Sequence, residues 1–235
     1  MKFVIFIFLI FVSDLTFSQT FDYPVIPSKG YGTQSFIPEG WKVIDSAYGD
    51  LNYDNYTDVA YILQYKDTVM ENRFFGPGER DYDLDATLPR ILVVLLQEAA
   101  GDLYQLGLQN NSFILRSNEG GVFGDPLFGI SIKENVLILN FFGGSRNKWG
   151  LTYKFRFQNE EWRLIGATNR DFDSLTGEYE NYDYNFLTNK VKITKGNENE
   201  NRKEEKWESV KINVLKTFKT FVKPWTWEIK KDRFL

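Results

Sequence analysis

The segment with the most specific chemistry runs from Gly49 to Asp58 and reads Gly-Asp-Leu-Asn-Tyr-Asp-Asn-Tyr-Thr-Asp. Counted from its first aspartate, oxygen-bearing side chains occupy positions 1, 3, 5 and 9, which are Asp50, Asn52, Asp54 and Asp58. Calcium is a hard cation that takes about six to eight oxygen ligands, and a tightly coiled loop brings alternate side chains to one point. The spacing therefore predicts a calcium site, to which Tyr56 adds its backbone carbonyl oxygen.

Two further positions define the kind of loop. The sixth position of such a loop usually needs a positive φ, and here it is Asn55, the most tolerant residue type after glycine. The twelfth position, a bidentate glutamate in helix–loop–helix calcium sites, is Tyr61 within an apolar run, so the loop is not an EF-hand. The alternative is a polar turn without an ion, because Asp and Asn are common in turns. Magnesium is a weaker candidate, since it demands tighter octahedral geometry.

Residues 49–63 resemble one repeat of the FG-GAP/VCBS type, whose core reads Gly-Asp-x-Asn-x-Asp-Gly-x-x-Asp before an apolar strand. The four side-chain ligands each match a liganding position of that motif, whereas Asn55 replaces the usual glycine. Such repeats form blades of integrin-like β-propellers, but only one convincing copy is found, and a propeller needs several. Phe36–Asp45, Gly129-Ile-Ser-Ile and Phe142-Gly-Gly-Ser are also similar to small secreted bacterial proteins with a single such loop. The resemblance implies a calcium-stabilised β fold and no enzyme activity.

Two other sets of side chains suggest different chemistry. Asp171 and Asp173 lie near Glu178 and Glu180 in the sequence and could supply two carboxylates for glycosidic acid/base catalysis. The required separation cannot be derived from the sequence, and acidic hairpin ends are common, so a structural role is favoured. The tryptophans suggest stacking against sugars, with Trp149 expected to be the most exposed and a patch expected around Trp149 and Trp225 to Trp227.

The composition excludes several classes of site. The 235-residue chain has no cysteine and no histidine, which excludes disulfides, thiol catalysis, Ser-His-Asp triads and imidazole-ligated metals. Its formal net charge of -4 gives no broad basic field, so non-specific nucleic-acid binding is not expected.

The N-terminus has the features of a secretory signal. Lys2 precedes the apolar residues 3–12, and the small residues Thr16 and Ser18 follow, so we expect cleavage after Ser18. The apolar run is too short for a membrane span, which takes about 20 residues. We therefore predict a signal peptide over residues 1–18 and a mature protein in a periplasm or outside the cell, without a membrane span after cleavage.

The rest of the chain indicates a mainly β fold of antiparallel hairpins in one domain, residues 19–235. Apolar runs at 59–63 and 90–97 predict buried strands, and three hairpins are expected within 130–142, 151–165 and 182–194. The alternation in 151–157 places aromatic side chains on one face and Thr152, Lys154 and Arg156 on the other. Residues 67–87 and 196–206 are expected to be exposed loops, the second flexible. The meander could form a propeller-like blade or a sandwich.

The leading hypothesis is a secreted or periplasmic calcium-binding β protein, in which the ion orders a loop for structure or interaction. The first alternative is a module that binds a glycan or a protein at the cell surface through exposed aromatic residues. The second is a carboxylate-dependent hydrolase, which requires two carboxylates in a concave pocket with one raised pKa.

Overall fold

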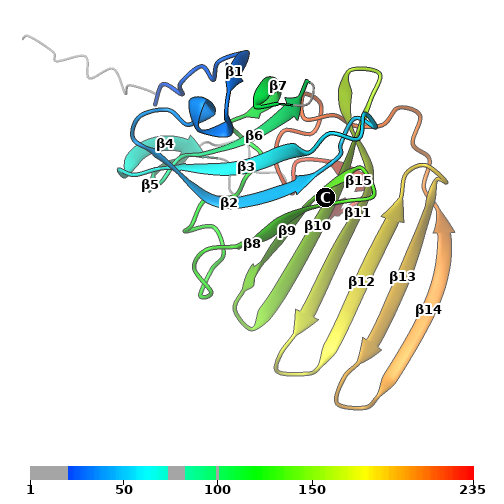
Figure 1. Ribbon diagram of the computed structural model, residues 1–235. Helices are drawn as coiled ribbons and strands as arrows, with labels where there is room; N and C mark the ends of the chain where they lie inside the picture. Colours follow the sequence, from blue (N-terminus) through cyan, green and yellow to red (C-terminus); the bar gives the residue numbers. More distant parts are fainter. Residues whose placement is uncertain (1–20, 74–82, 99–100) are drawn as a thin grey trace, which may run out of the picture.

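The computed structural model describes residues 21–73, 83–98 and 101–235, so the expected signal peptide lies outside the described residues. Strands make up 58% of the protein and helix 2%, which confirms the mainly β, antiparallel prediction. Two sheets face each other as a β sandwich (Figure 1). Within the described ranges, no helix is long and apolar enough to cross a lipid bilayer.

The first sheet has five strands in the order β1-β7-β6-β3-β2. Their bounds are β1 (Lys29–Tyr31), β2 (Trp41–Gly49), β3 (Asp58–Tyr65), β6 (Arg90–Gln97) and β7 (Leu103–Asn110). The central strands β3 and β6 are buried on both faces, because the second sheet covers one face and the N-terminal segment covers the other with Ile26 and Phe36. Burial on both faces explains their continuous apolar sequences.

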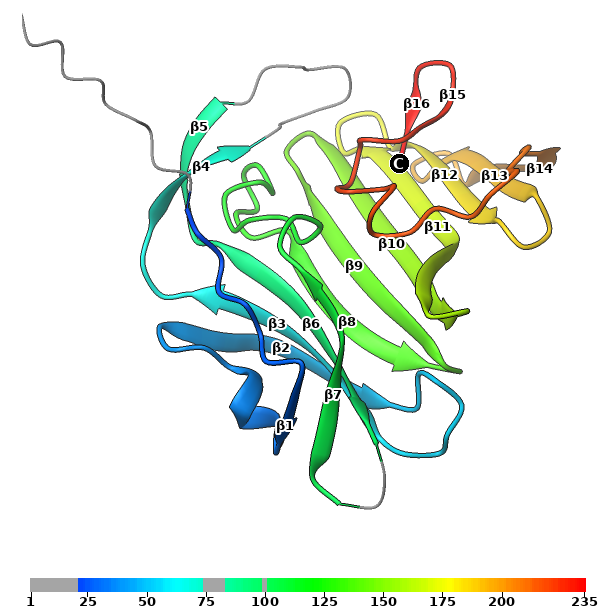
Figure 2. The ribbon, with the colours of Figure 1, turned by 90° about the horizontal axis from the view of Figure 1, so that it is seen from above.

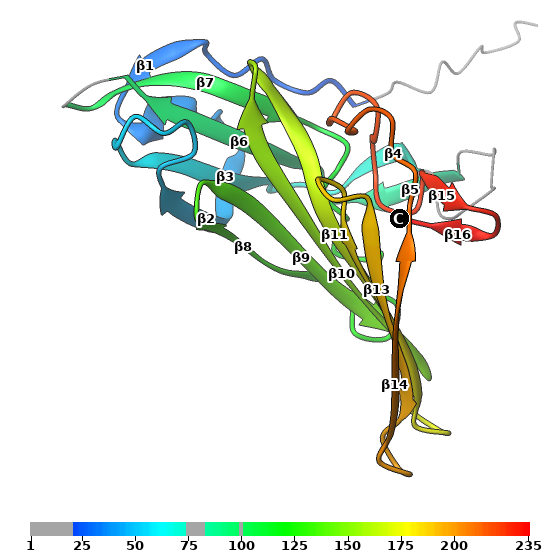
Figure 3. The same cartoon turned by 90° about the vertical axis from the view of Figure 1, so that its right-hand side faces the viewer.

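The second sheet has seven strands that follow one another in chain order, each joined to the next by a turn. They are β8 (Leu127–Lys133), β9 (Val136–Gly144), β10 (Asn147–Gln158), β11 (Glu161–Asp173), β12 (Glu178–Asn185), β13 (Lys190–Asn197) and β14 (Arg202–Ser209). Figure 3 shows the twist of this sheet, from the slanted β9 and β10 to the upright β14. The three hairpins predicted from the sequence all lie in this sheet and are confirmed.

The core lies between the two sheets and is closed by the C-terminal segment. Leu151, Tyr153 and Phe155 of β10 point into it, as the alternation predicted. Residues 210–227 form no strand but pack on this inner face, where Phe218 stacks on Phe155 with ring centroids 3.9 Å apart. The segment continues into the hairpin of β15 (Glu228–Lys230) and β16 (Arg233–Phe234), which lies above the same sheet in Figure 2.

The loop predicted over residues 196–206 is confirmed as an exposed turn at residues 198–201 and is wrong for the rest, which lies in β13 and β14. Residues 202–209 form β14, which pairs with β13 along its whole length and is exposed at almost every position. A strand at the edge of a sheet can be stabilised by backbone hydrogen bonds and cross-strand ion pairs without burying side chains, and charged residues protect such an edge. The polar composition was therefore compatible with a strand.

The loop predicted over residues 67–87 is also wrong in the part that the structure describes. β4 (Val69–Arg73) and β5 (Asp83–Thr87) form a hairpin, while residues 74–82 lie outside the described residues. Glu71, Arg73 and Thr87 are buried in this hairpin although each is polar or charged. They are buried because each has a partner in a polar cluster that is described below. The only helix in the described ranges is the short 3-10 turn η1 (Thr33–Phe36).

Candidate functional site

The seven-stranded sheet has two faces with different surroundings. The face that carries Leu151 and Tyr153 is the inner face, against the core. The opposite side, which we call the outer face, carries Asn140 and Phe142 of β9 and Thr152 of β10, as the register of β9 on β10 requires. No strand of the five-stranded sheet is paired to this sheet, and the described C-terminal segment packs on the inner face. The outer face is therefore covered neither by the five-stranded sheet nor by the described C-terminal segment.

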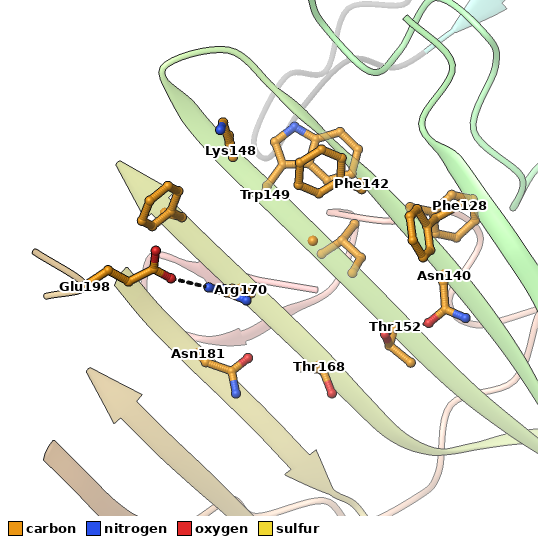
Figure 4. A pocket seen from close by; sticks show the side chains of 14 residues that line it. Phe128, Asn140, Phe142, Lys148, Trp149, Thr152, Thr168, Arg170, Asn181 and Glu198 are labelled. Carbon is orange, nitrogen blue, oxygen red and sulfur yellow. Dashed lines mark hydrogen bonds and ion pairs between the residues drawn. The ribbon is translucent and has the colours of Figure 1, made fainter. Parts of the chain in front are cut away.

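A cavity of about 490 Å³ opens on the outer face across β8 to β12 (Figure 4). Its apolar end is formed by Phe128, which is 78% exposed, and by Phe142, which is 38% exposed. A bulge in β8 between Leu127 and Gly129 positions Phe128, and Gly129 adopts a φ of 142° that side-chain-bearing residues rarely adopt. The bulge turns a large aromatic ring outward at the edge of the cavity.

Side chains with amide and hydroxyl groups form the middle of the cavity. Thr152 donates a hydrogen bond of 2.8 Å from its hydroxyl to Oδ1 of Asn140 on the neighbouring strand. Thr168 and Asn181 line the same wall, on β11 and β12. These groups hold donors and acceptors in fixed positions on a rigid sheet, which is the arrangement that recognises a polar ligand.

A second cavity of about 490 Å³ continues over β12 to β14. The two cavities share Arg170, Asn181 and Glu198, and Arg170 forms an ion pair of 3.0 Å with Glu198 between them. The outer face therefore offers an elongated groove that crosses the strands, aromatic at one end and charged at the other.

Of the tryptophan patch expected from the sequence, only Trp149 is among the residues that line the first cavity (Figure 4). Trp149 and Trp225 do touch, with ring centroids 4.7 Å apart, but both are half-buried against the core, and Trp227 packs on Phe186. Among the described tryptophans, Trp207 on the edge strand is the most exposed, at 63%. The prediction for Trp149 is wrong because its ring lies over Gly143, where any Cβ would collide with it.

The loop 50–58 is folded by its own acidic side chains. Asp50 accepts backbone N–H groups from Asn52, Tyr53 and Asn55, at 3.1, 2.6 and 3.1 Å. Asp54 accepts the backbone N–H of Tyr56 at 2.8 Å. Asn55 has a φ of 67°, as the sixth position of the motif predicted.

Asp58 ties this loop to the five-stranded sheet. Its carboxylate is fully buried and accepts the backbone N–H groups of Leu51 at 2.7 Å and Gln97 at 2.9 Å. Burial raises the pKa of Asp58 to about 6; these two hydrogen bonds oppose the rise, and the charges of Asp54 and Asp50 add to it. The backbone carbonyl of Asp50 accepts a hydrogen bond of 2.9 Å from Asn135 in the β8–β9 turn, so the loop also contacts the second sheet.

The donor chemistry of the loop suits a hard cation, because every side-chain ligand offers oxygen. Oδ1 of Asp50 accepts two N–H groups, whereas Oδ2 of Asp50 and both carboxylate oxygens of Asp58 accept one each and keep a further lone pair for a metal. The side chains are not gathered into a finished cage, however. In the described part of the chain no three acidic groups form a metal-binding cluster, and the amide of Asn52 donates to Asp54 at 2.8 Å. An ion at this loop would require Asn52 to turn its oxygen inward, so the calcium site stays a prediction.

The four acidic residues considered for catalysis, Asp171, Asp173, Glu178 and Glu180, all line one cavity of about 430 Å³. Asp171 and Glu180 face each other across β11 and β12 on the inner side. Burial, and then the charge of Glu180, raise the pKa of Asp171. Burial also disfavours the Glu180 carboxylate, but its bonds with Lys195 and Tyr182 lower its pKa overall. Asp173 is instead paired with Arg146 at 2.7 Å in the turn, and the hydrolase stays a prediction.

A buried polar cluster was missed in the sequence. The Glu71 carboxylate accepts hydrogen bonds from Arg116, from the Thr87 hydroxyl and from the Tyr23 hydroxyl. Beside it, Glu119 accepts from Arg73 at 3.0 Å and from Lys223 at 2.8 Å. The cluster ties the N-terminal segment, the β4–β5 hairpin and the C-terminal segment together. The residues of this cluster are far apart in the sequence. The only signal in the sequence was that residues of opposite charge lie close together in two short segments, Glu71 near Arg73 and Arg116 near Glu119.

Comparison with known proteins identifies no relative: no family model, no curated protein and no solved structure matches this chain. The resemblance to an FG-GAP/VCBS repeat therefore depends on residues 49–63 alone.

Proposed function

We propose that the protein is a secreted or periplasmic binding protein that holds a glycan in the groove on the outer face of its seven-stranded sheet. The observation that carries this proposal is the pair of adjoining cavities of about 490 Å³ each. The aromatic rings of Phe128 and Phe142 offer flat apolar surfaces for the C–H faces of a sugar ring. Asn140, Thr152, Thr168 and Asn181 offer the amide and hydroxyl groups that suit sugar hydroxyls.

A glycan array probed with the mature protein tests this proposal. We expect binding to a subset of oligosaccharides, and a loss of about tenfold in affinity in the Phe128→Ala/Phe142→Ala variant, because stacking area is removed. Val25→Ala/Val214→Ala is the matched control, since both side chains are exposed and neither lines the groove. Absence of binding to any glycan, or equal binding by the aromatic double variant, would contradict the proposal.

The second candidate function is the binding of one calcium ion at the loop 50–58, with a structural role. The observation that favours it is the loop backbone, which has the positive φ at Asn55 that the motif requires. An ion would screen the repulsion among Asp50, Asp54 and Asp58, and would stiffen a loop that contacts both sheets through Gln97 and Asn135.

Thermal melting in EDTA, in calcium and in magnesium tests the ion site. At a hundredfold excess over the dissociation constant, calcium should add about 2.7 kcal/mol to the free energy of unfolding. For a chain of this size that corresponds to a melting temperature higher by about 5 to 10 °C. Asp50→Ala/Asp54→Ala should abolish the calcium-dependent shift, whatever it does to the melting temperature in EDTA.

The control for the ion experiment is Asp67→Ala/Asp102→Ala, in which two exposed aspartates outside the loop are removed. This variant should keep the full calcium-dependent shift. If millimolar calcium leaves the melting temperature of the unmutated protein unchanged, the loop is a polar turn and not an ion site.

A further inference from the structure

The charged residues of the outer face are unevenly distributed. On β10 the outward positions include Lys148, Lys154 and Arg156, and none is acidic. On β11 the outward positions opposite this strand include Arg163 and Arg170. The protein as a whole has a net charge of -4, whereas the β10–β11 part of this side is basic. Farther along the sheet the outward residues are mixed in charge, with Asp183 and Glu205 beside Lys192 and Lys203.

Several of these cations lack a neutralising partner. Within the described ranges, no acidic side chain forms an ion pair with Lys148, Lys154 or Arg156. Lys148 instead lies 5.8 Å from the ring centroid of Phe123 and 5.6 Å from that of Phe172. Of this row of cations on β10, Lys148 lines the groove itself, and Lys154 and Arg156 follow on the outward side of the same strand, beyond the residues that line the two cavities.

Arg156 and Arg163 add a second, independent observation. They are directly opposite each other across β10 and β11, and like charges in this position destabilise a sheet. The Nε atom of each is buried and has no hydrogen-bond partner. Arg163 already forms an ion pair of 3.0 Å with Glu161. Burying an unsatisfied donor carries a free-energy penalty, and an anion beside the Arg156 guanidinium would reduce this penalty and the repulsion between the two arginines.

The inner side of the same sheet differs where it extends beyond the core. Its inward positions on β12 and β14 include Glu178, Glu180, Glu204 and Glu208. These glutamates form ion pairs with cations on the same side, which are Lys195, Arg202 and Lys206. The charges of the inner side are therefore largely paired, so a negatively charged chain would be attracted more strongly to the unpaired cations of β10.

We propose that the glycan held in the groove is an acidic oligosaccharide that extends from Lys148 along β10, so that its carboxylates or sulfates lie over Lys154 and Arg156. This inference rests on the proposed function and adds the charge of the ligand. The amide and hydroxyl groups of Asn140 and Thr152 suit the hydroxyls of a sugar chain.

Calorimetry with two matched hexasaccharides tests the inference. The probes are a hexamer of galacturonic acid and the same hexamer with its carboxylates reduced to alcohols. We expect the acidic hexamer to bind at least tenfold more tightly, and its affinity to fall as the salt concentration rises, because exposed charges are screened by salt.

Substitutions in the basic row of β10 test whether these residues cause the preference for the acidic hexamer. Lys154→Gln/Arg156→Gln should lower the affinity for the acidic hexamer by about tenfold or more and leave that for the reduced hexamer unchanged. Lys154→Arg, which keeps the charge, should retain the preference even if the double variant is unstable. Lys206→Gln, an exposed position on the inner side of β14, is the control and should have no effect.

The outcomes separate the inference from the proposed function. Equal binding of the two hexamers, or binding of neutral glycans only, would overturn the inference and leave the proposed function standing. Binding of neither hexamer or any arrayed glycan would overturn both. Tighter binding to an oligothymidylate or to anionic phosphatidylserine vesicles than to the acidic hexamer would also overturn the inference, because the occupant would belong to another class.

Discussion

At the scale of single residues, Glu71 shows how a charge can be buried in this fold. Its carboxylate is nearly inaccessible and receives hydrogen bonds from Arg116, Thr87 and Tyr23, so each lone pair finds a donor. Arg116 is itself fully buried. Removing one partner of such a pair leaves an uncompensated charge, which is more costly than the pair itself is stabilising.

Glu71→Gln should therefore lower the free energy of unfolding by about 3 to 5 kcal/mol at neutral pH. Burial disfavours the ionised carboxylate, but the bonds with Arg116 outweigh it and lower the pKa of Glu71 from 4.5 to about 2. A lowered folded-state pKa stabilises the protein above pH 4.5, and this contribution is lost as the pH falls from 4.5 towards 2. Denaturant unfolding of the variant and the unmutated protein should show that the difference between their free energies of unfolding becomes smaller as the pH falls through that range.

Glu200→Gln is the control for this prediction, because Glu200 is exposed in the β13–β14 turn and its ion pair with Arg202 lies in solvent. It should unfold like the unmutated protein at every pH. A difference between Glu71→Gln and the unmutated protein that stays constant from pH 7 to pH 2 would contradict the assignment of the buried charge.

The residues of the loop 50–58 were the part of the molecule most accessible to sequence reasoning. The need for a positive φ at Asn55 follows from spacing alone, and the structure has it. The burial of Asp58 could not be predicted in the same way, because its two donors are Leu51 within the loop and Gln97 on a distant strand. Short-range spacing determines the loop backbone, and long-range packing determines how its carboxylates are used.

At the scale of elements, hairpins were predictable where alternation and turn residues agree. Glu134 and Asn135 between β8 and β9 have φ values of 51° and 60°, the conformation of a two-residue hairpin turn. β14 was not predictable by the same signals, because an edge strand with exposed side chains has no apolar alternation. The bulge that exposes Phe128 was also not predictable, because Gly129 is its only indication in the sequence.

At the scale of the whole molecule, function depends on which face of the seven-stranded sheet remains uncovered. The sequence already separates Thr152, Lys154 and Arg156 from the aromatic residues of β10. It does not reveal that β9, β11 and β12 place their outward residues beside them, because the order and register of the strands are long-range properties. The groove and its basic row therefore appear only in the assembled sheet.

Methyl-group NMR of the protein titrated with the acidic hexasaccharide tests the central claim most directly, because side-chain methyl groups distinguish the two faces of the sheet. The account predicts shifts for Ile138, Thr152 and Thr168 on the outer face, and none for Val191 and Ile193 on the inner face. Shifts confined to Val191 and Ile193, with the outer methyl groups unchanged, would contradict the account and place the ligand on the inner side.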